Sequence, residues 1–111
     1  MDQSERKRML RSLVLGLCDE ILYCTRGEEG PEADVHDDIA EFVAEISRDE
    51  IAALDFILKV GKDGERWNSE VLPQNEAIIP LLYALELLLR KYKALALYGV
   101  EKNTPQLRWF R

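Results

Sequence analysis

The sequence AIIPLLYALELLLRKYKALALY, residues 77–98, is the most apolar segment of the chain and sets its architecture. Seventeen of its twenty-two residues are apolar, and no glycine interrupts the run before Gly99. This pattern predicts one long helix that ends at Gly99, with Pro80 in the first turn or two, where few backbone donors are lost. A helix that is apolar on all sides has to be surrounded by other helices.

A membrane-spanning helix is one alternative for this segment, because such a helix needs about twenty apolar residues with few charges. Here Glu86 lies in the middle, and Arg90, Lys91 and Lys93 crowd the last third. Burying these charges in lipid costs on the order of several kcal/mol. We therefore expect a central helix in a soluble bundle and no membrane contact.

The outer side of this helix is a candidate oligomer interface, since four helices in 111 residues leave little to cover both of its sides. We predict an interface at Tyr83, Leu87 and Tyr98, joined by Trp109 and Phe110 of the C-terminal tail. Aromatic and arginine residues, which the tail combines, are enriched in interface hot spots. A helix that serves only the core, with the tail folded back over the bundle, stays open as the alternative.

A first helix is predicted at about residues 3–26. Asp2 and Glu5 have the spacing of an N-terminal capping box, and Gly27 follows where a left-handed C-terminal cap belongs. The apolar residues between them recur every three or four positions, which predicts one buried face. That face consists of Leu10, Leu13, Val14, Leu17, Ile21 and Cys24.

Two more helices are predicted at about residues 34–46 and 49–60. The first of these has a buried face made of Val35, Ile39, Phe42, Val43 and Ile46. Residues 47–50 then show a capping-box pattern for the second, which ends at Gly61 and has apolar residues on more than one side. We predict a long loop at residues 62–75, with a short hairpin or a fifth helical turn as alternatives.

Together these patterns predict a single all-α domain over residues 1–111: a compact bundle of four main helices, with a long loop before the last helix and an irregular C-terminal tail. Hydrophobic residues make up 47% of the chain and charged residues 32%, which is globular composition. Cys18 and Cys24 point about 120° apart on one helix and cannot easily bridge. Unpaired cysteines and the lack of a recognisable signal peptide lead us to expect a cytoplasmic protein.

The charge is divided unevenly along the chain, although the net value is only −6. Residues 19–55 hold thirteen acidic and two basic residues. Residues 1–18 and 56–111 each carry a small positive excess. An acidic middle between basic ends can be neutralised within the fold, across an oligomer or by a basic partner. Direct binding of nucleic acid through the acidic segment is disfavoured because phosphates would be repelled.

The helix predicted at 34–46 has a row of carboxylates opposite its buried face. We predict that Asp37, Asp38, Glu41 and Glu45 form this row, with no basic residue between them. A solvated helix face is one interpretation of the row. The second is a binding site for a protein partner with a basic surface. A calcium or magnesium site is the third, although no loop with the spacing of metal ligands is present.

Several enzyme classes conflict with the composition. His36 and Asp37 spell the dipeptide of HD-type metal-dependent phosphohydrolases, but their metal shell needs further histidines and the chain has one. No Cys-x-x-Cys pair is present for a zinc site. Residues 28–32 imitate half of the acidic motif of helical nucleotide pyrophosphohydrolases, but Gly30 and Pro31 place it in a loop and no second half follows.

We therefore predict no catalytic residues, no cofactor and no metal site. The sequence favours a non-catalytic protein–protein interaction module. Its more specific form is a small acidic inhibitor of the immunity type, which covers the basic, nucleic-acid-handling surface of a partner. The alternative is a self-assembling structural subunit of a homo-oligomer or larger complex. A magnesium-dependent nucleotide hydrolase is the third hypothesis.

Overall fold

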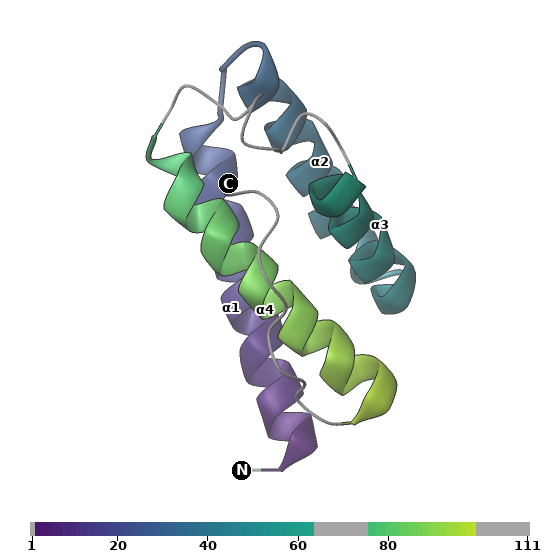
Figure 1. The fold of residues 1–111 in the computed structure, drawn as a ribbon. Helices are drawn as coiled ribbons and strands as arrows, with labels where there is room; N and C mark the ends of the chain where they lie inside the picture. Colours follow the sequence, from purple (N-terminus) through teal and green to yellow (C-terminus); the bar gives the residue numbers. More distant parts are fainter. Residues whose placement is uncertain (1, 64–75, 100–111) are drawn as a thin grey trace.

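The computed structural model describes residues 2–63 and 76–99, and these form four α-helices without a strand. The helices are α1 (Gln3–Cys24), α2 (Pro31–Glu45), α3 (Glu50–Asp63) and α4 (Ile78–Tyr98), shown in Figure 1. The predicted all-α bundle of four helices is confirmed. The predicted tail, and the predicted loop apart from its first two residues, lie outside the described residues.

The N-terminal caps follow the sequence with one change of residue. The Asp2 carboxylate accepts a hydrogen bond from the Glu5 backbone N–H at 2.8 Å, as the capping pattern predicted for α1. For α3 the cap is Asp49, whose carboxylate accepts from the Ala52 N–H at 3.1 Å, and not Ser47. Ser47, the first residue of the predicted pattern, lies two positions before this cap.

The helix ends differ from the predicted ones by up to three residues. α2 begins at Pro31, three residues earlier than predicted, because proline is well suited to the first helical position. α3 continues through Gly61 to Asp63, since one glycine inside a helix costs only about 1 kcal/mol. Gly99 ends α4 in the left-handed conformation, with φ of 70°, and Pro80 lies in the first turn, both as predicted.

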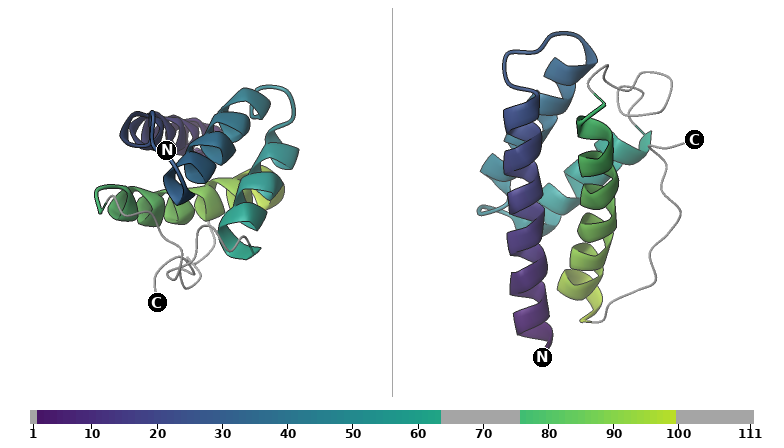
Figure 2. Two further views of the ribbon diagram at one scale, coloured as in Figure 1. Left: turned by 90° about the horizontal axis from the view of Figure 1, so that it is seen from above. Right: turned by 90° about the vertical axis from the view of Figure 1, so that its left-hand side faces the viewer.

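The two long helices α1 and α4 run antiparallel and side by side, and α2 and α3 form a shorter helical pair packed against them (Figures 1 and 2). Each helix contacts its two neighbours in the cycle α1–α2–α3–α4. Among the described residues, the diagonal pairs α1–α3 and α2–α4 have no backbone approach within 8 Å between Cα atoms. Side chains from all four helices therefore fill the centre.

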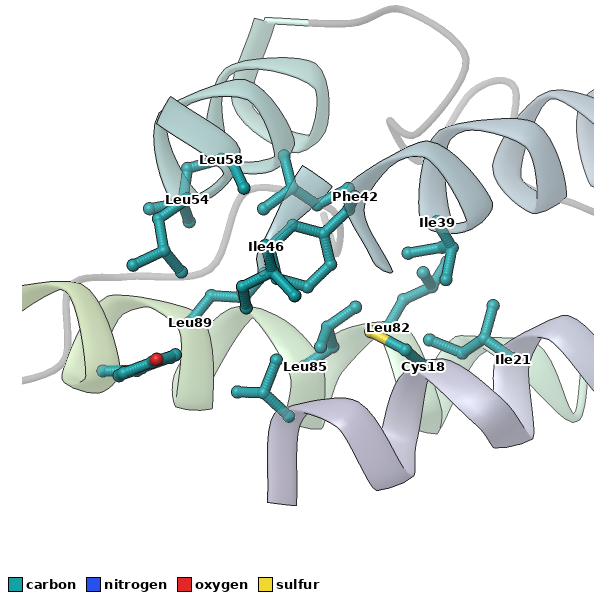
Figure 3. Close-up of a cluster of buried hydrophobic side chains, with 14 of the residues drawn as sticks. Cys18, Ile21, Ile39, Phe42, Ile46, Leu54, Leu58, Leu82, Leu85 and Leu89 are labelled. Atoms are coloured by element: carbon teal, nitrogen blue, oxygen red, sulfur yellow. The ribbon is translucent and has the colours of Figure 1, made fainter. Parts of the chain in front are cut away.

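The core lies along the bundle axis and draws on every helix (Figure 3). Its labelled members in Figure 3 are Cys18, Ile21, Ile39, Phe42, Ile46, Leu54, Leu58, Leu82, Leu85 and Leu89. The prediction for α1 was wrong in part, because Leu13 is 49% exposed and Leu17 is half-buried, while Cys18 is buried. The buried row of α1 follows Leu10, Val14, Cys18 and Ile21, and Leu13 lies to one side of it.

Candidate interaction surfaces

The exposed face of α2 holds a continuous row of carboxylates. Asp34, Asp37 and Glu41 are exposed, and Glu45 is half-buried. Their spacing of three, four and four residues places them along one side of the helix. We call Asp34, Asp37, Glu41 and Glu45 the acidic row. At 1.5 Å per residue the row is roughly 16 Å long.

The predicted membership of this row was wrong at one position. The Asp38 side chain is only 5% exposed, so it belongs to the inner side of α2. It lies about 100° around the helix from Asp37, which turns it toward the core. Asp34 takes its place because α2 starts at Pro31, and the row can therefore extend one turn further toward the N-terminus.

The surroundings of the acidic row neutralise little of its charge. Glu45 pairs with Arg48 at 3.1 Å, and His36 Nδ1 lies 3.8 Å from a carboxylate oxygen of Asp37. Along the chain, residues 19–46 contain ten acidic residues and a single basic one, Arg26. The second half of α1, the α1–α2 connection and α2 therefore form an acidic part of the molecule.

A polar network joins α1, α3 and α4. The buried hydroxyl of Tyr92 donates a hydrogen bond to Glu50 Oε1, and Lys7 Nζ lies 2.8 Å from Glu50 Oε2. Burial raises the pKa of Glu50, but the hydrogen bonds from Lys7 and Tyr92 outweigh it and hold that pKa below its ordinary value. Burial and the bond to Glu50 raise the pKa of Tyr92 above its ordinary value.

The charges within α4 are also satisfied inside the fold. Glu86, mid-helix, is buried, and Arg90 donates to its Oε1 from Nη2 at 3.1 Å and from Nε at 3.3 Å. Lys93 forms an ion pair with Asp55 of α3. These contacts explain how so apolar a helix tolerates charges at its centre.

The residues predicted for an oligomer interface lie on one side of α4. Tyr83 and Tyr98 are 45% and 61% exposed, and Leu87 is half-buried. Their spacing of four and eleven residues places them on a common face. Trp109 and Phe110 lie outside the described residues.

Sequence reasoning missed the exposed apolar side chains of α1. Met9 is 45%, Leu13 49% and Tyr23 78% exposed. Among the residues with described side chains, every large exposed hydrophobic residue lies on α1 or α4. The sequence did contain a signal, because Met9 and Leu13 are four positions apart and each directly precedes a residue of the buried row of α1.

The remaining chemistry-bearing groups are dispersed. Neither Cys18 nor Cys24 forms a disulfide, and burial, with a contribution from Asp19, raises the pKa of Cys18 to about 12. Within residues 2–63 and 76–99, no group of three or more histidine, cysteine, aspartate or glutamate side chains is placed to hold a metal ion. None of the four described helices has the length and apolar character that crossing a bilayer requires.

Comparisons with known proteins add no relationship to these surfaces. The chain matches no protein-family model, and searches of curated proteins and of solved structures give no significant match. Any functional proposal therefore depends on the geometry and charge of the surfaces themselves.

Proposed function

We propose that this chain is a non-catalytic protein-binding module whose acidic row docks on the basic surface of a partner protein. The observation that supports the proposal is the row itself: three exposed carboxylates, Asp34, Asp37 and Glu41, follow one another with no basic residue beside them on α2. Like charges at this spacing repel and slightly destabilise the helix. Basic side chains of a partner would attract these carboxylates and offset the repulsion between them.

The scaffold behind the row is suited to rigid recognition. The opposite side of α2 is anchored in the core by Val35, Ile39 and Phe42, all fully buried. The carboxylates are therefore held in a fixed line and need little ordering on binding, which lowers the entropic cost of association. Carboxylates carried by a loop would lack this fixed spacing.

The partner class we propose is a protein that handles nucleic acid. Such proteins present basic surfaces to phosphates, and an acidic protein that covers the surface inhibits them. The absence of a disulfide at Cys18 and Cys24 supports a reducing, cytoplasmic setting for this role.

Charge reversal on matched surfaces tests this proposal. The partner is first captured from the native host on the immobilised chain, identified by mass spectrometry and purified. Asp34→Lys/Asp37→Lys/Glu41→Lys should weaken its binding at least tenfold. Glu5→Lys/Glu76→Lys, which reverses two exposed acids outside the acidic part of the molecule, should change this affinity by less than about threefold. If both variants bind the partner with equal affinity at low salt, the acidic row is not part of the binding site.

A self-assembling subunit is the second candidate function, and the exposure of Tyr83 and Tyr98 favours it. In this function α4 forms the interface, with Leu87 between the two tyrosines. Leu87→Asp should then dissociate the assembly in light scattering, whereas reversal of the acidic row should leave it intact.

A further inference from the structure

The solvent-facing side of α1 has a regular pattern that the acidic row does not involve. Five exposed residues follow one another at intervals of four, three, four and three: Met9, Leu13, Gly16, Glu20 and Tyr23. Arg6, also exposed, precedes Met9 by three. Alternation of three and four is the spacing of the contact line of a coiled coil. We call these six positions the α1 seam.

Gly16 lies at the centre of the seam and faces open space. A Cβ atom built at Gly16 would meet nothing within 4 Å. A glycine inside a helix costs roughly 0.5–1 kcal/mol relative to alanine, so the fold itself would be better served by a side chain. Without a side chain at this position, the backbone of α1 next to the exposed Leu13 is open to solvent, so a side chain from outside can approach it closely.

We propose that the α1 seam is a dimer interface at which two copies of this chain pack with their α1 helices antiparallel. In an antiparallel pair of this spacing, Leu13 of each copy lies over Gly16 of the other. Met9 then faces Glu20, and Arg6 faces the ring of Tyr23, a favourable cation–π arrangement. Leu13 of each copy thus fits against Gly16 of the other, and a two-fold axis requires such a self-complementary surface.

The distribution of charge along α1 selects a second copy of this chain in antiparallel orientation. The first half of the helix exposes Arg6 and Arg8 against Glu5 alone, and its second half exposes Asp19 and Glu20. Antiparallel packing places each basic half beside the acidic half of the other copy, twice by symmetry. Parallel packing would instead oppose basic to basic and acidic to acidic.

This interface is separate from both functional surfaces described above. The acidic row lies on α2, and the alternative oligomer face with Tyr83 and Leu87 lies on α4. The proposal is therefore independent of the partner-binding proposal, and substitutions can separate the three surfaces.

Size-exclusion chromatography with light scattering, from about 10 to 200 μM, tests the interface. The unaltered chain should reach the mass of a dimer in this range, whereas Leu13→Glu and Gly16→Gln should remain monomers. Both positions are exposed, so circular dichroism should show unchanged helicity. Leu97→Gln, which alters an exposed apolar residue of α4, is the matched control and should still dimerise. A monomer at 200 μM, or a dimer that survives both seam variants, would overturn the proposal.

The orientation has a test of its own. In this arrangement Arg6 of one copy lies one helical turn from Glu20 of the other, close enough for their long side chains to attract each other. Arg6→Glu and Glu20→Arg should each weaken dimerisation about tenfold at low salt, because each replaces the two symmetric attractions with repulsions. The combined variant should return to within about threefold of the unaltered chain, since the pairs are restored with their signs exchanged. Single variants that dimerise as well as the unaltered chain would rule out the antiparallel arrangement.

Discussion

At the scale of single residues, Tyr92 is the side chain that links three helices. Its ring is buried in the core and its hydroxyl donates to Glu50 of α3, which in turn pairs with Lys7 of α1. Removing the hydroxyl by Tyr92→Phe leaves the ring in place and leaves one oxygen of Glu50 without this donor. We expect a loss of about 1–2 kcal/mol in the free energy of unfolding, measured by urea denaturation.

The control for this measurement is Tyr23→Phe. Tyr23 is 78% exposed, and a change at such a surface position stays within about 0.5 kcal/mol. Equal stability of the two phenylalanine variants would show that the Tyr92 hydroxyl adds nothing to the link between the helices.

The same network predicts how stability depends on pH. The pKa of Glu50 is lower in the folded protein than its ordinary value of 4.5, so the folded state favours the ionised carboxylate. Its contribution is present above pH 4.5 and is lost as the pH falls through the folded-state pKa. The difference in unfolding free energy between the unaltered chain and Glu50→Gln should therefore shrink below pH 4.5. A difference that stays constant from pH 7 to pH 3 would contradict this.

At the scale of the helix, two ion pairs with the same 3.1 Å separation are expected to contribute differently to the free energy of unfolding. Glu86–Arg90 has a buried carboxylate, whereas Glu45–Arg48 lies at the surface. Arg90→Met leaves the Glu86 charge buried without this guanidinium and should cost about 2 kcal/mol or more. Arg48→Met should cost less than about 1 kcal/mol. If both variants lower the melting temperature equally, burial does not determine how much the Glu86–Arg90 pair stabilises the fold.

Helix-scale patterns also show how far the sequence determines the fold and the surfaces. The four helices followed from apolar spacing and caps, because these signals act within a few residues. The acidic row was predicted with one wrong member. Asp34 was missed because the helix was expected to begin there instead of at Pro31, and Asp38 was misplaced although Val35 and Phe42, three and four residues away, are buried. The exposed side chains of α1 were missed for a similar reason: Leu13 has helical spacing with the core residues but falls just outside the buried row.

Contacts between helices were less accessible to sequence reasoning. The bond between Tyr92 and Glu50 joins residues 42 positions apart, and local spacing contains no information about such a pair. The burial of Glu86 shows the same limit: its spacing of four residues from Arg90 is local, but the sequence does not show that other helices cover this carboxylate. These pairings depend on which helices become neighbours.

At the scale of the whole molecule, the surface separates into unlike regions. Carboxylates dominate the second half of α1 and the exposed side of α2, whereas the large exposed apolar residues with described side chains belong to α1 and α4. A dimer formed through the α1 seam would leave both acidic rows outside the interface. Two rows on one particle would let the dimer hold a partner with two basic sites more tightly than either row alone.

The central claim is that the acidic row binds a basic protein, and the salt dependence of the association rate with the captured partner tests it most directly. Charge steering is screened over about 10 Å at 0.1 M salt, so it weakens steeply as ionic strength rises. We expect the association rate of the unaltered chain to fall at least tenfold between 50 and 500 mM salt, and that of Asp34→Lys/Asp37→Lys/Glu41→Lys to change little. An association rate that is independent of salt for both proteins would contradict the account.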